Sequence, residues 1–189
     1  ATKLEAIEDA GQGRAVATCL RPLLEDPAGL AELAVHAATR GARVLIIRNT
    51  VAACQATHAA LDAIDSALSM RCGNRAAPHH ARYASRDRIA LDEAVEAALK
   101  AERPVDEGLV VVATQTVQQS LDLDADLLLT DLCPMDVLLQ RIGRLHRHER
   151  TRPEGFERPR VVIATPHERD LEGLLRHTPG RDTCGLGTV

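Results

Sequence analysis

Aromatic residues are almost absent from this chain of 189 residues. Tryptophan is missing altogether, and Tyr83 and Phe156 are the only tyrosine and phenylalanine. Proteins that hold single-stranded nucleic acid by its bases stack those bases on aromatic rings, so this mode of binding is nearly excluded. Any contact with nucleic acid must be made with phosphates, and we expect such binding to be weak, salt-sensitive and independent of sequence.

Other absences exclude further classes of protein. The five cysteines form no Cys-x-x-Cys pair, which argues against a zinc site or a disulfide framework and favours a reducing, cytoplasmic location. No run of 18 apolar residues predicts a membrane span, and no charged-then-apolar start marks a signal peptide. Neither His79 with His80 nor His146 with His148 would converge on one ion in a strand or helix, so we expect no metal site.

The composition that remains is that of one globular domain, with 45% apolar and 26% charged residues and a net charge of -4. Apolar segments typical of buried strands alternate with patterns of helical spacing, which predicts an α/β fold with a mainly parallel sheet and helices on its faces. We expect strands near residues 15–20, 43–47, 68–72, 109–113, 127–130 and 160–164, and helices near 28–40, 51–67, 86–101 and 135–146. We assign residues 1–166 to this domain, and 167–189 to a helical extension and linker, because the tail is rich in Gly and Thr.

Polar residues follow two of the predicted strands. Asn49 and Thr50 come directly before a predicted helix, and Thr114 and Gln115 follow the strand near 109–113. Open parallel sheets bind ligands outside the carboxyl ends of their strands, and a helix start suits a phosphate. Asn49 or Thr50 would serve equally well as a helix cap. Three aspartates come next, in a turn where such residues usually satisfy the backbone: Asp122, Asp124 and Asp126.

The most basic segment is QRIGRLHRHER, from Gln140 to Arg150. We expect a helix from Pro134 through Arg147, because proline suits the first helical turn. At ~100° per residue, Gln140, Arg144 and Arg147 then share one face. The opposite, core-facing side would hold Met135, Leu138, Ile142 and Leu145. A basic face of this kind is usually just solvated, but no acid three or four residues earlier offsets the repulsion of these arginines. The pattern therefore favours a bound anion, and guanidinium groups match phosphate best.

A phosphate loop, GxxxxGK[ST], is missing from the chain. Its only lysines are Lys3 and Lys100, and neither follows a glycine. The chain thus carries arginines suited to a triphosphate without the loop that would hold one. Arginines in this position act on phosphates that another domain holds. The sequence therefore predicts half of a nucleotide site.

The segment ATQTVQQSLDLDADLLLTDLCPMDVLLQRIGRLHRHERTRPEG resembles the fifth and sixth motifs of a superfamily-two helicase, in the version of the CRISPR-associated helicase–nucleases of type I systems. VLIIRNTVAACQ is similar to that family's fourth motif and HARYASRDR to a further family segment, so the resemblance covers roughly residues 41–165. It implies a three-layer, second RecA-like domain that closes on a first one carrying the phosphate loop and the magnesium motif. The family's nuclease is of the HD type; no His here is followed by Asp, so we expect no nuclease activity in this chain.

The resemblance also implies roles for single residues. Gln140, Arg144 and Arg147 would contact the phosphates of ATP, and Arg144 and Arg147 would be the catalytic arginines. Arg141, in the same nucleotide-binding motif, would link the motifs to one another, and Asp122 would lie near the ribose or a magnesium-bound water. The residues that would follow the phosphate backbone of one DNA strand are Asn49, Thr50, His80, Arg82, Thr114 and Gln115. Gln118 stands where the family commonly has Glu, so the role of that acid does not carry over directly.

The family implies ATP with magnesium as cofactor, held mainly by the first RecA-like domain. It implies single-stranded DNA, the first RecA-like domain, the nuclease domain and a CRISPR surveillance complex as partners, and no activity for this chain alone. Two alternatives stay open on the residues themselves. The chain would then be a non-catalytic nucleic-acid- or protein-binding module with a helicase-like fold, or half of an RNA helicase. Stimulation by DNA or by RNA would separate the helicases, and a phosphate loop encoded upstream would argue against the binding module.

Overall fold

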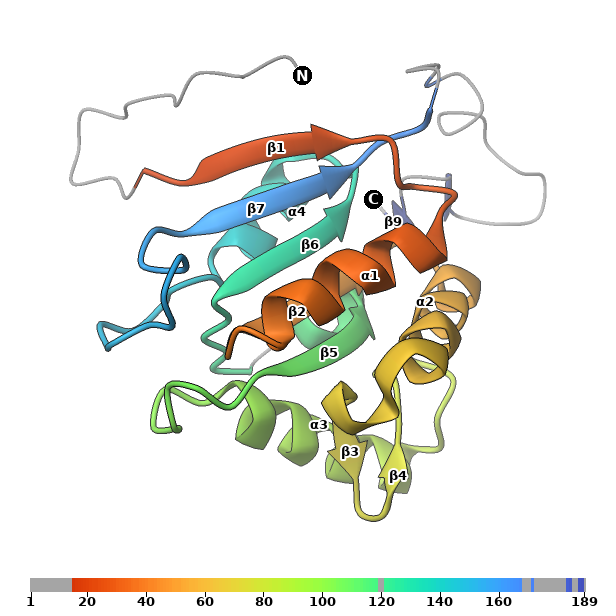
Figure 1. Cartoon of the computed structure of the whole chain (residues 1–189). Helices are drawn as coiled ribbons and strands as arrows, with labels where there is room; N and C mark the ends of the chain where they lie inside the picture. Colours follow the sequence, from red (N-terminus) through yellow and green to blue (C-terminus); the bar gives the residue numbers. More distant parts are fainter. Residues whose placement is uncertain (1–14, 119–120, 168–170, 172–182, 185–186, 189) are drawn as a thin grey trace.

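The centre of the molecule is a five-stranded sheet in the order β1-β7-β6-β2-β5, in which every neighbouring pair is parallel (Figure 1). This computed structural model describes residues 15–118, 121–167, 171, 183–184 and 187–188. The strands of the sheet are β1 (Ala17–Arg21), β2 (Arg43–Arg48), β5 (Leu109–Thr114), β6 (Leu127–Asp131) and β7 (Arg160–Ala164). The predicted parallel sheet is confirmed.

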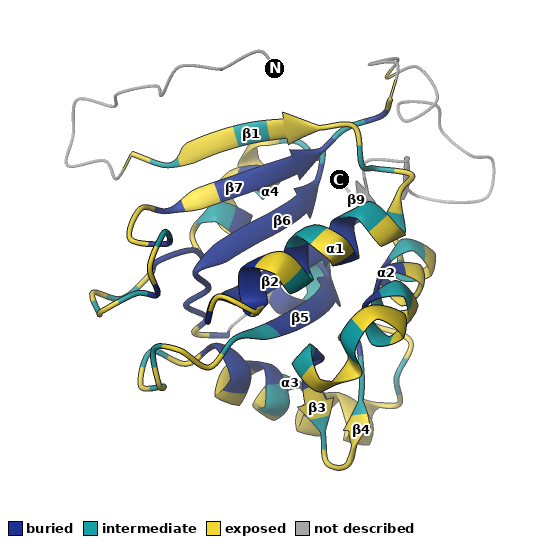
Figure 2. Cartoon of the chain, viewed as in Figure 1, coloured by how far each residue is buried: buried dark blue, intermediate teal, exposed yellow. Residues whose placement is uncertain are grey.

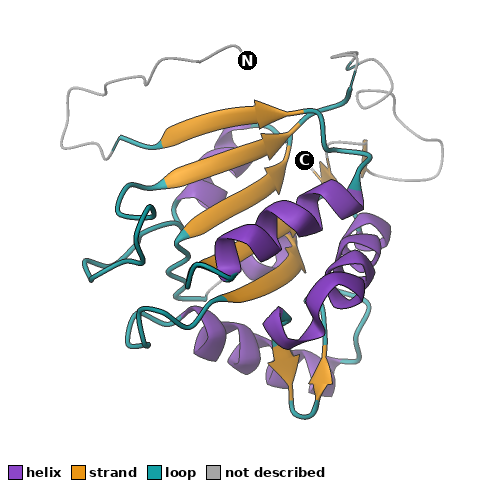
Figure 3. Ribbon diagram, viewed as in Figure 1, coloured by secondary structure: helices purple, strands orange, loops and turns teal. Residues whose placement is uncertain are grey.

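Two pairs of helices cover the two faces of the sheet. Helices α1 (Pro27–Ala38) and α2 (Val51–Asp65) pack on one face, and α3 (Ser85–Leu99) and α4 (Met135–Ile142) pack on the other. Figure 3 shows α1 and α2 in front of the strands and α3 and α4 behind them. The predicted three-layer, RecA-like architecture is thus confirmed.

Strand β2 shows why this sequence folds in this way. Val44 and Ile46 belong to the core beneath α1 and α2, whereas Leu45 and Ile47 belong to the core beneath α3 and α4. A strand covered on both faces needs an unbroken apolar run rather than an alternating one. Figure 2 shows β2, β6 and most of β7 buried and the edge strand β1 largely exposed.

Local signals set most helix boundaries. Helix α1 begins at Pro27, and the side chain of Asp26 accepts a hydrogen bond from the backbone N–H of Gly29 at 2.9 Å. Thr50 caps α2 in the same way, because its hydroxyl accepts from the N–H of Ala53 at 3.1 Å. The cap predicted at Thr50 is therefore confirmed.

The strand predicted near residues 68–72 is only partly confirmed, because just its last two residues form a strand and that strand lies outside the main sheet. A short helical turn, η1 (Ser66–Leu68), occupies its start, and only Ser69 bridges β5, at Val110. The chain then leaves the sheet as the hairpin of β3 (Arg71–Cys72) and β4 (Arg75–Ala76), which turns at Gly73 with a φ of 59°. Glycine tolerates this left-handed conformation, so the chain can turn at Gly73 and form the hairpin instead of continuing to pair with β5.

The helix predicted after Pro134 is confirmed as α4, but its predicted end at Arg147 is wrong, because α4 ends at Ile142. Beyond Gly143 the backbone pairs with the segment that precedes β6. The N–H of Ala125 donates to the carbonyl of Arg144 at 2.9 Å, and the N–H of His146 donates to the carbonyl of Ala125 at 3.0 Å. His146 adopts a φ of 50°, which no helix allows. Pairing with a segment distant in sequence therefore replaces the last predicted turn.

The domain boundary predicted at residue 166 falls near the end of the described core. Most of the predicted extension, 167–189, lies outside the described residues, as do residues 1–14. Within it, β8 (Thr183–Cys184) pairs with β9 (Gly187–Thr188) in an antiparallel hairpin. Between residue 15 and the end of the described chain, no helix is both long enough and apolar enough to cross a membrane.

Candidate functional site

The predicted site residues fall into two groups at opposite ends of the strands. Asn49 and Thr114 lie at the carboxyl ends of β2 and β5, which are neighbours in the sheet. Asp122 and Arg144 lie near the amino end of β6, where Ala125 bridges Leu145. A six-residue strand spans roughly 20 Å, so the two groups cannot share one small ligand. The expectation that ligands sit beyond the carboxyl ends thus applies to the first group only.

Residues 143–152, which follow α4, form a segment that we name the arginine strap. It carries Arg144 and Arg147, while Gln140 is exposed on the last turn of α4. Because the helix ends early, these three residues do not share one helical face. Leu138 and Leu145 are buried as predicted, but Met135 is 67% exposed and does not belong to the core.

Arg144 and Arg147 nevertheless lie close together. The guanidinium of Arg144 donates through Nη1 to the carbonyl of Leu121 at 2.5 Å. Burial lowers the pKa of Arg144, and the positive charge of Arg147 lowers it further, while Asp122 acts in the opposite direction. The two guanidiniums contact neighbouring residues of one segment, Arg144 at Leu121 and Arg147 at Asp122, and so form one positively charged edge on the strap.

Asp122 compensates part of this charge, which the sequence argument did not foresee. One of its oxygens lies 2.9 Å from Nε of Arg147, and the ring of His148 lies 3.0 Å from the same carboxylate. Both partners of the Arg147 pair are exposed, at 45% and 61% of the side chain. An exposed pair of this kind is worth roughly 0–1 kcal/mol, so a more highly charged anion can replace the carboxylate.

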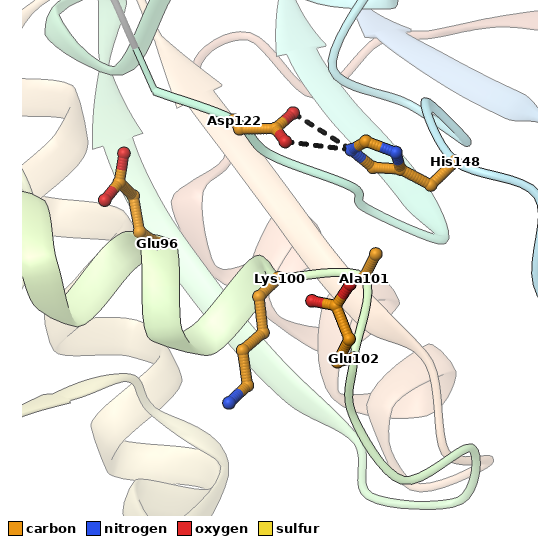
Figure 4. A pocket seen from close by; sticks show the side chains of 6 residues that line it. All are labelled: Glu96, Lys100, Ala101, Glu102, Asp122 and His148. Carbon is orange, nitrogen blue, oxygen red and sulfur yellow. Dashed lines mark hydrogen bonds and ion pairs between the residues drawn. The ribbon is translucent and has the colours of Figure 1, made fainter.

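A pocket of about 240 Å³ opens beside this pair, lined by Glu96, Lys100, Ala101, Glu102, Asp122 and His148. Figure 4 shows Asp122 and His148 facing each other on one side of it, with Glu96 of α3 and the segment that follows α3 around the rest. Pockets for small molecules usually measure roughly 300–1,000 Å³ and are mostly apolar. This one is smaller and largely polar, so within the described residues the strap does not close a nucleotide site by itself.

Arg141 points away from the strap into the fold. Its side chain is 2% exposed and donates to the hydroxyl of Thr130 at 2.7 Å and to the amide oxygen of Asn49 at 3.0 Å. Burial lowers its pKa. Arg141 thus joins the segment after β2 to the end of β6, and a direct contact with nucleotide remains a prediction.

Asn49 is buried at 6% exposure and its amide is used within the fold. Its Nδ2 donates to the carbonyl of Leu132 at 2.8 Å, and its backbone N–H donates to Asp131 at 2.8 Å. Arg48 forms a fully buried ion pair with the same aspartate at 2.9 Å. The exposed neighbour, Thr50, is better placed for a phosphate than Asn49, whose predicted strand contact stays untested.

His80 and Arg82 lie beside the end of β5. The ring of His80 stacks on Tyr83 with centroids 4.5 Å apart and approaches Nε2 of Gln55 at 3.4 Å. Burial lowers the pKa of His80, so its neutral form is favoured. Arg82 is exposed and its backbone N–H donates to Nδ1 of His80 at 3.3 Å.

Thr114 and Gln115 complete the first group. Thr114 is buried and its hydroxyl lies 3.2 Å from that of Thr116, which in turn lies 2.9 Å from Nδ1 of His79. Nε2 of His79 meets Asp92 on α3 at 2.6 Å. The side chain of Gln118 lies outside the described residues.

Asp124 and Asp126 do more than satisfy a turn. Both carboxylates are buried, and they form ion pairs with Arg103, Arg150 and Arg152. This cluster was not predicted from the sequence. The available signal is the row of alternating acids at 122–126, which matches the basic residues at 147–152. In the described part of the chain, no group of His, Cys, Asp and Glu could hold a metal ion.

Comparisons with known proteins agree with this geometry. Residues 40–150 match the family described as "CRISPR-associated nuclease/helicase Cas3, C-terminal". The chain is 48% identical over 92 residues to the CRISPR-associated endonuclease/helicase Cas3 of Thermus thermophilus, covering 49% of this chain and 10% of that protein. It is 39% identical over 163 residues to the Escherichia coli protein of the same description, covering 84% and 17%. The chain therefore spans about a tenth to a sixth of the length of these relatives.

Among solved structures, the crystal structure of T. fusca Cas3-ATP superimposes with a TM-score of 0.70 at 31% identity. The superposition covers 85% of this chain and 19% of that one. The family match includes the strap up to Arg150 and every predicted site residue, since all of these lie between residues 40 and 150.

Proposed function

This chain belongs to the family of the C-terminal part of the CRISPR-associated nuclease/helicase Cas3, and on that premise we propose that it is the second RecA-like domain of an ATP-dependent DNA helicase. Residues 1–166 form this domain, and 167–189 lead to a following one. A first RecA-like domain, outside this chain, supplies the phosphate loop. The chain alone is then inactive as an ATPase.

The observation that carries the proposal is the exposed positive edge of the arginine strap. Arg144 and Arg147 contact the neighbouring residues Leu121 and Asp122, and among the described residues an exchangeable surface pair with Asp122 offsets the charge of Arg147. ATP with magnesium, when bound between two such domains, supplies the free energy of phosphate hydrolysis. Gln140, Arg144 and Arg147 would contact its phosphates, Asp122 would turn to the ribose or to a magnesium-bound water, and positive charge at the terminal phosphate would stabilise the transition state.

The first group of site residues, at the carboxyl ends of β2 and β5, is named the strand-end group and supports the DNA half of the proposal. Thr50, Arg82 and Gln115 come from three segments beside the carboxyl ends of β2 and β5, and His80 approaches Gln55 of α2. Asn49 and Thr114 are buried at these strand ends and hydrogen-bond to Leu132 and Thr116. Hydroxyl, amide and guanidinium groups suit sugar and phosphate contacts that carry no sequence information. Such contacts fit a motor that moves along any single-stranded sequence.

Stepping follows from the separation of the two groups. When the strap is drawn to a nucleotide on the first RecA-like domain, the whole sheet turns with it, and the strand-end group moves along the DNA. When the attraction falls after phosphate release, the domains part again. The nuclease domain and a CRISPR surveillance complex are the expected partners, in keeping with the CRISPR association of the family.

The decisive test is Arg147→Ala in the intact protein, or in this chain together with a phosphate-loop domain. We expect DNA-stimulated ATP hydrolysis to fall by about 10³-fold. Arg158→Ala is the matched control, because Arg158 is an exposed arginine outside the strap. Unchanged hydrolysis in Arg147→Ala would refute the proposal, and stimulation by RNA alone would point to an RNA helicase.

A further inference from the structure

Arg147 lies between two residues that are held from inside the fold. The N–H of His146 donates to the carbonyl of Ala125 at 3.0 Å, and its Nε2 lies 3.1 Å from the carbonyl oxygen of Asp126. On the other side, the N–H of His148 donates to Oδ1 of Asp124 at 3.2 Å. The backbone of Arg147 is thus fixed at both ends, while its side chain reaches the surface.

A buried cluster of charges anchors this arrangement. Arg150 contacts Asp124 at 2.8 Å and Asp126 at 2.5 Å, and Arg152 contacts the same two carboxylates at 2.7 Å and 2.8 Å. The guanidiniums of Arg150 and Arg152 therefore each bridge both acids through two charge-assisted hydrogen bonds, which gives directional control. Arg103, from the loop after α3, approaches the pair from a third element, at 3.3 Å from Asp126.

The backbone at His146 needs such an anchor. Its φ of 50° lies in the left-handed region, which is unfavourable for any residue with a side chain. A residue stays in this region only where its surroundings hold it there. The hydrogen bonds of His146 and the ion pairs two and four residues beyond His148 provide that restraint.

Stability alone does not account for this cluster. Three guanidiniums and two carboxylates lose most of their hydration, and a buried ionic cluster is often no more stabilising than an apolar one of the same volume. A buried ionic cluster can instead provide conformational specificity, because it holds the chain in one conformation. Here that conformation fixes the residues on both sides of Arg147.

We infer that Asp124 and Asp126 are positioning residues for Arg147, acting through the strap. The inference rests on the proposed function, because it assumes that Arg147 acts at a phosphate. It assigns the two acids no contact with nucleotide, so their loss should change the turnover of ATP rather than its binding.

The experiment is a double-mutant cycle in the intact protein at saturating single-stranded DNA. Asp124→Asn keeps the shape of the side chain and removes its charge. We expect kcat for ATP hydrolysis to fall by about 10²-fold, as for a misplacement of about 1 Å, while KM for ATP changes by less than about threefold. In the Arg147→Ala background, Asp124→Asn should have no further effect, because the residue that it positions is gone.

Leu30→Ala is the control for stability, since Leu30 lies 1% exposed in the core beneath α1, on the other face of the sheet. It should lower the free energy of unfolding without lowering kcat. The inference would be overturned if the losses of kcat in Asp124→Asn and Arg147→Ala multiplied in the double variant. A loss of kcat in Leu30→Ala equal to that in Asp124→Asn would overturn it as well. If Asp124→Asn does not fold, Arg152→Lys replaces it in the double-mutant cycle. Lysine keeps the positive charge but cannot bridge Asp124 and Asp126 with two nitrogens as Arg152 does. Failure of the proposed function is separate, since it shows as unchanged hydrolysis in Arg147→Ala itself.

Discussion

Replacement of Arg141 by methionine should be among the most damaging single changes in the described core. The guanidinium donates to Thr130 at 2.7 Å, to Asn49 at 3.0 Å and to the carbonyl of Asp131 at 3.3 Å. Methionine fills a similar volume but donates no hydrogen bond, so Thr130 and Asn49 lose this donor, while the carbonyl of Asp131 keeps the hydroxyl of Thr130 at 3.1 Å. Asp131 also loses a nearby positive charge, although Arg48 remains with it.

The magnitude follows from these contacts. Hydrogen bonds from a charged donor are worth roughly 1.5–3 kcal/mol each, but removing a buried cation also relieves its own desolvation. We therefore expect a loss of about 3–5 kcal/mol rather than the full sum of the hydrogen bonds. At about 2–4 °C per kcal/mol for a chain of this size, Tm should fall by about 6–20 °C.

Urea titration of the purified chain, followed by circular dichroism, measures this loss directly. Arg158→Met, at an exposed arginine, is the control and should change stability by less than about 0.5 kcal/mol. Arg141→Lys keeps the charge but not the forked donors, so it should lie between the wild type and Arg141→Met. A loss below about 1 kcal/mol for Arg141→Met would show that the buried hydrogen bonds do not hold the two segments together.

Three further predictions concern the fold and its titration. Gly108→Ala should destabilise by about 3 kcal/mol, because its Cβ would meet the carbonyl oxygen of Ala38 at 1.7 Å. Gly73→Ala, with no atom within 4 Å but a φ of 59°, should cost about 1 kcal/mol, and thermal unfolding of both variants checks the difference. Burial raises the pKa of Cys54 to about 12, so a thiol reagent at pH 8 should label the partly exposed Cys19 and Cys72 in the native chain but not Cys54, as read by mass spectrometry. Burial acts to raise the pKa of Asp124, but hydrogen bonds from Arg152 and Arg150 outweigh it and hold that pKa below the usual value. Its stabilisation is therefore present above about pH 4 and is lost as pH falls through the lower folded pKa, so Asp124→Asn should flatten the pH dependence of unfolding below about pH 4.

The parts of the fold that were predictable are those that local pattern dictates. The apolar run of β2 requires cover on both faces, and the spacing of apolar residues in α1 and α2 places them on that sheet. The failures are where a contact distant in sequence competes with local propensity. Residues 143–147 have a helical pattern, yet their backbone pairs with Ala125.

The candidate site was predicted less completely, for the same reason. Helical projection brought Arg144 and Arg147 together correctly, but through a helix that the chain does not form. It also left their charge uncompensated, because Asp122 lies 25 residues away from Arg147 in sequence and 2.9 Å away in space. In the sequence, such ion-pair partners appear only as a weak alternation of charged residues. Which of them pair and become buried depends on the finished fold.

Arg141 is a predicted site residue whose contacts tie α4 to the carboxyl ends of β2 and β6. Its Cα lies on α4, two residues before the arginine strap, whereas its guanidinium holds Asn49 beside the strand-end group. If a DNA phosphate shifts the segment around Thr50, the buried side chain of Arg141 would therefore transmit that shift to α4. Arg141→Lys weakens that connection without removing the charge. In the intact protein it should reduce the stimulation of ATP hydrolysis by single-stranded DNA by about tenfold, a usual size for coupling between sites, and leave the unstimulated rate within about twofold. Equal losses in both rates would mean that Arg141 supports the fold alone and that DNA reaches the strap by another route.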